Sequence, residues 1–238
     1  MEQLTGRVWY LPHETAADRP VLGYVRGERR TLMLDAGNSP RHAALFLRDL
    51  RRGGLPAPDL VALTHRHWDH TFGLCALPIP AVACLTTQRY LEAFSAIRWD
   101  EAAALDFLDG EGIREFSEGH LRLEYPDLSR ICVRPADLVF RRELEIDLGG
   151  CRCVLRTLTS SHSDDSVLIL VPEEGVLFLG DAGCEACVRG AWIDDPVLLR
   201  REIAELEALD FSVCLNGHTA PMTRAELFDW LSGRLAAL

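Results

Sequence analysis

Short apolar runs, separated by polar or glycine-containing breaks, recur along the chain and predict a strand-rich protein. In the first third these runs are GRVWYL, PVLGYVRG, RRTLMLDAG and DLVALT, with a hairpin through Gly27 between the second and the third. Over residues 119–158 strands are predicted again, at HLRLEY, ADLVF, LEIDLGG and CRCVLRTL, and SVLILVP, GVLFLGD and FSVCLNGH follow. Glu173, Glu174 and Gly175 predict a hairpin between SVLILVP and GVLFLGD.

Apolar positions at helical spacing predict helices between these strands. One begins after Ser39, which can cap it, with Pro40 in its first turn, and it stops at Gly53. Further helices are predicted over residues 86–108, 196–209 and 223–236. Strands with intervening helices in both halves favour a strand-rich α/β layered fold. Because no linker, repeat or low-complexity stretch divides the chain, residues 1–238 are predicted to form a single domain.

The composition is that of an ordinary globular protein, since 48% of the 238 residues are hydrophobic and 26% are charged. The formal net charge of −11 disfavours binding to nucleic acid or to an anionic membrane, so neither is an expected partner. No apolar run is long enough to span a membrane, and MEQLTGRVWYLPHE lacks the basic start and apolar core of a signal peptide. The protein is therefore expected to be cytoplasmic.

The eight cysteines are expected to be thiols, because the expected compartment is reducing. They are Cys75, Cys84, Cys132, Cys151, Cys153, Cys184, Cys187 and Cys214. Cys151 and Cys153 lie two apart in a strand-like run, which favours packing on one face of a sheet. Cys184 and Cys187 form a single CxxC pair, and one pair alone is a weak signal for zinc.

The run LTHRHWDHTFG directly follows the strand-like DLVALT and crowds three histidines and an aspartate between His65 and His70. His65 and His67 are two apart, so on an extended segment they face the same way and can hold one ion. Asp69 and His70 follow on a turn and can reach a second ion. Such groups at the end of a buried strand are costly unless a cation compensates them. Imidazole and carboxylate bind zinc, and two ions about 3.5–4 Å apart lower the pKa of a shared water.

The HxHxDH motif and four further segments resemble the metallo-β-lactamase-fold superfamily, over nearly the whole chain. The segments are LMLDAG, SSHSDDS, VLFLGD and LNGH, and their order and their placement at strand ends agree with that family. The resemblance implies an αββα sandwich, in which two mixed β-sheets lie face to face, helices flank them on the outside, and the metals bind at one edge.

The resemblance also implies two divalent metal ions, Zn²⁺ first and Mn²⁺ or Fe²⁺ as alternatives, and it assigns their ligands position by position. The implied ligands are His65, His67 and His162 for the first ion, Asp69, His70 and His218 for the second, and Asp181 bridging both. Asp35 would support the metal-binding loop rather than bind metal. The remaining histidines, His13, His42 and His120, have no evident partner and are expected at the surface.

The implied reaction is hydrolysis by a dinuclear metal-dependent enzyme, in which a metal-bridging hydroxide attacks a small-molecule ester, lactone, thioester or cyclic amide. Asp69 is the candidate catalytic residue, because it can orient the hydroxide or carry a proton. A small phosphodiester is an alternative substrate. Some proteins similar to this family bind one iron and oxygenate sulfur compounds such as persulfides, which is the alternative activity. A degenerate member that only binds partners is disfavoured, because every ligand position is filled.

Several branches of the family fit the sequence less well. Secreted β-lactamases carry an export signal, which the N-terminal residues lack. Glyoxalase II continues into a helical domain, whereas twenty residues follow His218. Ribonuclease Z needs a basic surface for RNA, and flavodiiron proteins carry glutamate at the position of His67.

Residues 71–150 are predicted to include a cap of helix and strands over the metals, which would determine substrate specificity. The aromatic candidates for the pocket are Trp68, Tyr90, Phe94, Trp99, Tyr125 and Trp192. At least two of those from the predicted cap are expected to be core residues instead. Cys184 is expected to pack near the second metal without binding it. Asp164 and Asp165 are expected in a solvated turn.

Overall fold

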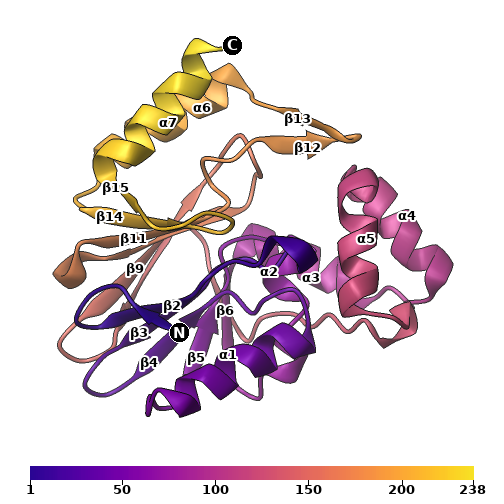
Figure 1. The fold of residues 1–238 in the computed structure, drawn as a ribbon, viewed down its shortest axis with the longest axis horizontal. Helices are drawn as coiled ribbons and strands as arrows, with labels where there is room; N and C mark the ends of the chain where they lie inside the picture. The colour runs from indigo at the N-terminus through magenta and orange to yellow at the C-terminus, as the bar shows by residue number, and fades with distance from the viewer.

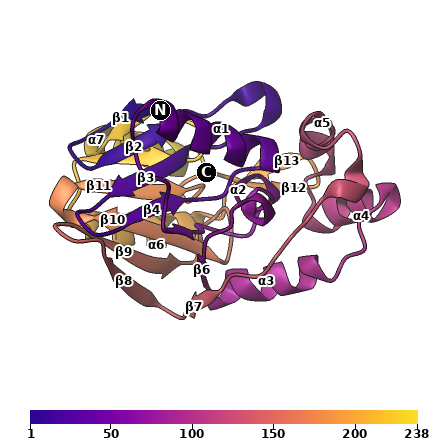
Figure 2. The same ribbon diagram turned by 90° about the horizontal axis from the view of Figure 1, so that it is seen from below.

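The computed structural model describes residues 1–238 and places two large mixed sheets face to face, with helices on the outside (Figures 1 and 2). The first sheet has seven strands in chain order: β1 (Glu2–Gln3), β2 (Val8–Leu11), β3 (Leu22–Arg26), β4 (Thr31–Leu34), β5 (Leu60–Ala62), β6 (Ala81–Cys84) and β7 (Leu138–Phe140). Strands β1 to β4 pair antiparallel, and β4 to β7 pair parallel. The predicted hairpin at Gly27 is confirmed by the antiparallel pairing of β3 with β4.

The second sheet has six strands in the order β15 (Met222–Thr223), β14 (Val213–Asn216), β11 (Val176–Gly180), β10 (Ser166–Val171), β9 (Arg152–Leu158) and β8 (Glu143–Asp147). Strands β10 and β11 form the predicted hairpin, in which Val171 pairs with Val176. Strands β11 and β14 run parallel, so their carboxyl ends lie at the same edge of the sheet. A small separate hairpin, β12 (Ala186–Val188) and β13 (Ala191–Ile193), follows β11.

Seven α-helices complete the fold. They are α1 (Pro40–Arg52), α2 (Trp68–Thr71), α3 (Leu85–Ser95), α4 (Glu101–Glu111), α5 (Arg114–Glu124), α6 (Pro196–Glu207) and α7 (Arg224–Ala236). The cap of α1 forms as predicted, because the Ser39 hydroxyl accepts a hydrogen bond from the His42 N–H at 3.1 Å. Four short 3₁₀ turns lie at Thr15–Ala17, Leu74–Ala76, Leu128–Arg130 and Pro172–Glu174. No helix has the length and apolar character needed to cross a membrane.

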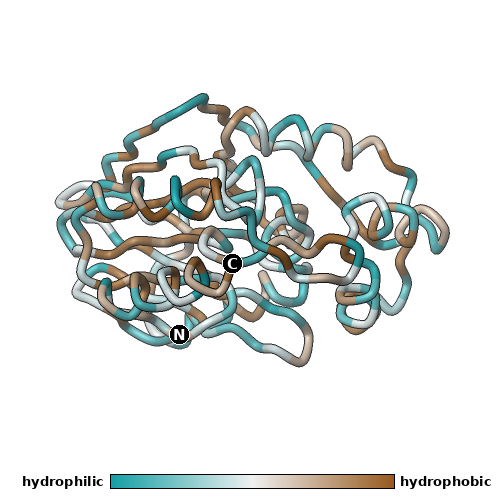
Figure 3. The backbone as a smooth tube through the Cα atoms, turned by 90° about the horizontal axis from the view of Figure 1, so that it is seen from above, coloured by the Kyte–Doolittle hydropathy of each residue, from teal (hydrophilic) through white to brown (hydrophobic).

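The core consists of three apolar layers, and the apolar strands run through the centre of the molecule (Figure 3). Twenty buried residues fill the space between the two sheets. Alternation along β4 assigns its side chains to different layers: Leu32 and Leu34 face the other sheet, and Met33 faces α1. A third cluster of 11 residues packs α6 and α7 onto the second sheet. The αββα sandwich implied by the sequence is thereby confirmed.

The helical cap differs from its prediction. Residues 86–108 do not form one helix, because Asp100 caps a new helix by accepting a hydrogen bond from the Ala103 N–H. The predicted strand HLRLEY is wrong, since these residues lie in and just after α5. Arg122 bonds Glu118 one turn earlier, and buried Leu121 faces the core, so helical spacing prevails over the apparent alternation of two.

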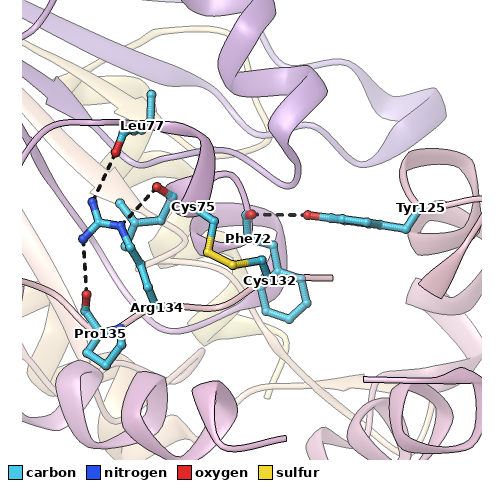
Figure 4. Close-up of a disulfide and its surroundings, with 8 residues drawn as sticks. Phe72, Cys75, Leu77, Tyr125, Cys132, Arg134 and Pro135 are labelled. Carbon is cyan, nitrogen blue, oxygen red and sulfur yellow. Dashed lines mark hydrogen bonds between the residues drawn. A yellow bond between two sulfur atoms is a disulfide. The ribbon is translucent and has the colours of Figure 1, made fainter. Parts of the chain in front are cut away.

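The expectation of eight free thiols is also wrong, because Cys75 and Cys132 form a disulfide (Figure 4). These residues are 57 positions apart in sequence, but folding brings their Cα atoms to 6.0 Å. The same region is held by Tyr125, whose hydroxyl donates to the Phe72 carbonyl, and by Arg134, whose guanidinium donates to the Leu77 carbonyl (Figure 4). The chain after the cap is thus tied to the loop that follows α2.

The three remaining histidines are not all at the surface. His42 lies in the first turn of α1 and is completely buried, and burial lowers its pKa to about 3, so this imidazole stays neutral. His120 is half-buried beside Phe116 on α5. His13 lines the cavity described below.

Candidate metal centre

The HxHxDH run lies where the predicted buried strand ends. Strand β5 stops at Ala62, an extended segment carries His65 and His67, and α2 then carries Asp69 and His70. Thr71 closes this short turn, because its hydroxyl donates to the His67 carbonyl at 2.9 Å. Strand ends also place two further candidate ligands, since Asp181 follows β11 and His218 lies two residues after β14.

Three imidazoles converge in the first ligand group. The nearest ring nitrogens of His65 and His67 are 3.1 Å apart, and those of His67 and His162 are 2.9 Å apart. All three ligand atoms lie within 4.8 Å of one another. Nitrogens this close and facing one another suit a single shared cation.

The second ligand group consists of Asp69, His70, Asp181 and His218, again within 4.8 Å of one another. Asp69 Oδ2 is 3.1 Å from both His70 Nε2 and His218 Nε2. Asp181 Oδ1 is 3.3 Å from His70 Nε2, and its Oδ2 is 3.3 Å from His218 Nε2. Two carboxylates and two imidazoles therefore surround one point.

Asp181 reaches both groups. Besides its contacts in the second group, its Oδ2 lies 3.6 Å from His162 Nε2 and 4.0 Å from His65 Nε2 in the first. The structure thus brings together the seven residues implied as ligands and places Asp181 between the two sets.

The chemistry of these donors fits divalent cations. Burial lowers the pKa of His65, His67 and His162, which keeps them in the neutral form that binds metal. His70 Nε2 and Asp181 Oδ1 are buried and face each other at 3.3 Å, but neither makes a hydrogen bond of normal geometry, which leaves both atoms available to a coordinated cation. Nitrogen-rich and mixed nitrogen–oxygen sets of this kind suit zinc and similar borderline metals.

The second group attracts positive charge strongly. Burial lowers the pKa of His70, but Asp69, Asp181 and Asp35 outweigh burial and raise it well above its ordinary value. Burial raises the pKa of Asp181, but His218 and His70 outweigh burial and leave it well below its ordinary value. A divalent cation in this position experiences the same attraction.

Further residues orient the imidazoles. Asp35 Oδ2 accepts from His70 Nδ1 at 2.8 Å, and the same carboxylate accepts from the Thr64 N–H and hydroxyl. Asp35 therefore lies behind the metal-binding loop, where the sequence placed it, and turns His70 Nε2 toward the site. The Glu185 carbonyl does the same for His162, at 2.8 Å from its Nδ1.

Asp18 is a site residue that the sequence reasoning missed. Its carboxylate is 3.5 Å from His218 Nδ1, on the ring side away from the ligand group. The loop that carries Asp18 is held by Asn38, whose side-chain amide donates to the Ala17 carbonyl at 2.7 Å. No local motif marks Asp18, because its proximity to His218 depends on contacts far along the chain.

A cavity of about 540 Å³ opens onto both ligand groups. Trp192 lines it as predicted, and Trp68 touches it while its side chain is otherwise buried. Tyr90 and Trp99 do not line the cavity, contrary to expectation. Trp99 packs against Phe72 and Phe107 in the core, and Tyr90 stacks under the Arg66 guanidinium, 4.2 Å from its ring centroid. Phe94 and Tyr125 are buried core residues, as at least two of the cap aromatics were predicted to be.

Arg66, between the first two histidines, joins three parts of the site. Its guanidinium donates to Glu111 at the end of α4 and to Asp164 and Asp165 after His162, each at 3.1 Å. The expectation of a solvated turn is therefore wrong for Asp165, which is buried and also accepts from Thr87. The cap and both histidine loops are tied together by this one side chain.

Glu202 on α6 is a completely buried carboxyl beneath the loops that carry His162 and Asp181. Burial raises its pKa from an ordinary value of 4.5 to about 7, against the opposing effect of the Ser161 and Gly183 peptide groups. The folded protein therefore holds a proton on Glu202 that the unfolded chain releases between these two values.

The contribution of Glu202 to stability is expected to be complete below pH 4.5 and to be lost as the pH rises through about 7. We expect Glu202→Gln to remove this loss, so that the change in unfolding free energy from pH 5 to pH 8 differs from wild type by about 3 kcal/mol. Urea unfolding of chelator-treated protein measures it. Glu207→Gln, an exposed change on the same helix, should behave as wild type, and equal pH dependence in wild type and Glu202→Gln would contradict the expectation.

An αββα sandwich with a seven-residue cluster of histidine and aspartate at its edge defines a class of metal-binding protein. A family model described as the metallo-beta-lactamase superfamily matches residues 20–218. The chain belongs to the metallo-β-lactamase superfamily, whose members are mostly metal-dependent hydrolases. A search of curated proteins gave no match.

Solved structures show the same fold. A metallo-beta-lactamase family protein from Thermus thermophilus has a TM-score of 0.69 at 19% identity, over 99% of this chain and 80% of that one. A metallo-beta-lactamase from Pontibacter korlensis has a TM-score of 0.67 at 16% identity, over 99% of this chain and 98% of that one. An archaeal metallo-beta-lactamase superfamily protein from Sulfolobus tokodaii has a TM-score of 0.62 at 23% identity, over 96% of this chain and 86% of that one. At these identities the likeness is one of fold alone.

Proposed function

We propose that the protein is a dinuclear metal-dependent hydrolase that cleaves a small-molecule ester, lactone, thioester or cyclic amide. The observation that carries the proposal is the position of Asp181, whose carboxylate lies within 4.0 Å of imidazole nitrogens from both ligand groups. A carboxylate shared in this way is what a two-metal site needs. The cluster also opens onto a cavity large enough for a small molecule.

The ligands divide between two ions. His65, His67 and His162 would hold the first, Asp69, His70 and His218 the second, and Asp181 would touch both. Divalent ions held by these residues would lower the pKa of a bound water and would polarise the bond under attack.

The protein's own residues would orient the imidazoles and transfer protons. Asp69 lines the cavity and lies 3.1 Å from His218 Nε2, so it is placed to accept a proton from the attacking water and to pass it to the leaving group. Asp35 keeps His70 facing the site, and Asp18 does so for His218. The acidic character of the chain supports a small molecule, rather than nucleic acid, as partner.

Elemental analysis of the purified, unchelated protein tests the proposal first. We expect about two zinc or manganese ions per chain. His65→Ala should hold fewer, because it removes one of three nitrogens from the first group, whereas His120→Ala should keep the wild-type content, since His120 lies on α5 outside both groups. The loaded protein is then assayed with esters, lactones, thioesters, cyclic amides and phosphodiesters.

The outcomes separate the alternatives. Two zinc or manganese ions with cleavage of acyl substrates supports the proposal, and cleavage of phosphodiesters alone replaces its substrate class. One iron per chain with oxygen consumption on a persulfide would overturn hydrolysis in favour of the dioxygenase. No metal in any variant after reconstitution would overturn the site itself.

A further inference from the structure

An aromatic pair stands at the mouth of the cavity. Phe116 on α5 and Trp192 on β13 both line it, and their rings meet edge to face with centroids 5.1 Å apart. Phe116 is 38% exposed and Trp192 is 47% exposed, and Val188 of the same hairpin extends the apolar surface at 45%. Large apolar side chains left open to solvent beside a reaction site are typical of surfaces that bind apolar ligands.

The pair is held in place by contacts between the β12–β13 hairpin and the cap. Cys187 Sγ lies 3.8 Å from the Gly112 carbonyl, where α4 ends. The hairpin turn packs against the start of α5, since a Cβ on Gly190 would lie 3.4 Å from the Glu115 carboxylate. Figure 1 shows the tip of this hairpin reaching toward α5. Arg66 fixes the other side, because it joins α4 to the metal-binding loop.

The charge of the cavity wall disfavours anionic substrates. Arg66 is the only arginine in the lining, no lysine is present, and its guanidinium is already bound by three carboxylates. Glu111 is one of these three carboxylates, and Glu185 lines the cavity outside both the implied ligands and this ion-pair network. A carboxylate or phosphate on the part of the substrate away from the reacting bond would meet negative charge there and no free cation.

We infer that the substrate carries an uncharged apolar chain or ring, which the Phe116–Trp192 pair covers while the acyl bond lies at the ligand groups. This inference rests on the proposed function and narrows its substrate class. In the reaction, water adds across the bond between the acyl carbon and its oxygen, sulfur or nitrogen substituent. A carboxylic acid and an alcohol, thiol or amine are released, so the atoms balance without an oxidant or reductant.

A series of p-nitrophenyl esters tests the inference with metal-loaded protein. We expect kcat/KM to rise by about tenfold or more from acetate to octanoate, because added methylene groups become buried against the pair. The p-nitrophenyl monoester of succinate matches the butyrate ester in length but ends in a carboxylate. It should react at least about tenfold more slowly than butyrate, because the wall is acidic.

Alanine variants test whether the dependence of kcat/KM on chain length arises at the Phe116–Trp192 pair. Phe116→Ala and Trp192→Ala should each lower the octanoate-to-acetate ratio of kcat/KM severalfold, by about fivefold to tenfold. Leu123→Ala is the matched control, since Leu123 lies on the same helix, is 56% exposed and does not line the cavity. Its ratio should equal that of wild type.

A binding measurement gives a second readout that needs no turnover. Octanamide should shift the tryptophan emission of metal-free protein to the blue, because it covers the half-exposed Trp192. The shift should disappear in Trp192→Phe, which lacks the indole that the ligand covers.

The results distinguish this inference from the proposed function. Ester cleavage without dependence on chain length, or a dependence unchanged in both alanine variants, would overturn the inference and leave the hydrolase standing. Equal rates for the succinate and butyrate esters would overturn the argument that the cavity wall disfavours anionic substrates. The proposed hydrolase activity would still stand. No cleavage of any ester, lactone, thioester or cyclic amide, together with the Trp192 emission shift, would instead overturn the proposed acyl hydrolysis and leave the apolar binding surface standing.

Discussion

Asp181→Ala is expected to hold one metal ion or fewer per chain and to lose hydrolysis by about two to three orders of magnitude. The carboxylate lies within 4.0 Å of nitrogens from both ligand groups, so its removal should weaken the binding of both ions at once. It also removes the carboxylate that lies within 4.0 Å of His65 and His162, whereas His70 and His218 keep Asp69 at 3.1 Å. Elemental analysis and ester turnover measure the two losses.

Asp164→Ala is the matched control for this variant. Its carboxylate also lies near the site, but it binds Arg66 and Tyr90 rather than the ligand groups. We expect it to keep the wild-type metal content. Circular dichroism should show that both variants are folded. Two ions retained in folded Asp181→Ala would contradict the role of Asp181 as the shared ligand.

Gly217→Ala is expected to disrupt the metal centre without removing any ligand. A Cβ at this position would lie 2.1 Å from Asp181 Oδ1 and 3.0 Å from His70 Cε1. The backbone cannot move away easily, because the Gly217 N–H donates to Gly180 and its carbonyl accepts from Val21. The ligands must therefore shift, and we expect about a hundredfold loss of hydrolysis, with a cost in stability of about 1–3 kcal/mol.

Gly233→Ala makes the same chemical change where nothing lies within 4 Å of the new Cβ. Gly233 is inside α7, so alanine there should stabilise the protein by about 0.5–1 kcal/mol and leave the metal content unchanged. Chemical denaturation and elemental analysis of the two variants side by side give the comparison. Wild-type metal content in Gly217→Ala would show that the loop accommodates the methyl group.

Local patterns predicted the parts of the fold that depend on neighbouring residues. The cap at Ser39, the hairpin at Gly27 and the strands that end before His65 and Asp181 all follow from short-range preferences. The strand predicted at HLRLEY is wrong because this segment depends on residues far along the chain. Its alternation fits a strand, but the bonds of Arg122 and the burial of Leu121 depend on α4 and the core.

By themselves, the local patterns of the sequence determined a strand-rich layered α/β fold and the dense HxHxDH motif at a strand end. The sandwich and the three remaining ligands, His162, Asp181 and His218, came from the resemblance of further segments to a known family. Only the tertiary structure placed Asp18 behind His218, joined Cys75 to Cys132, and paired Phe116 with Trp192 at the cavity mouth. Each of these pairs comes from segments far apart in the chain. Whether such side chains meet depends on how the cap, the hairpin and the sheets pack together, which no short stretch of sequence specifies.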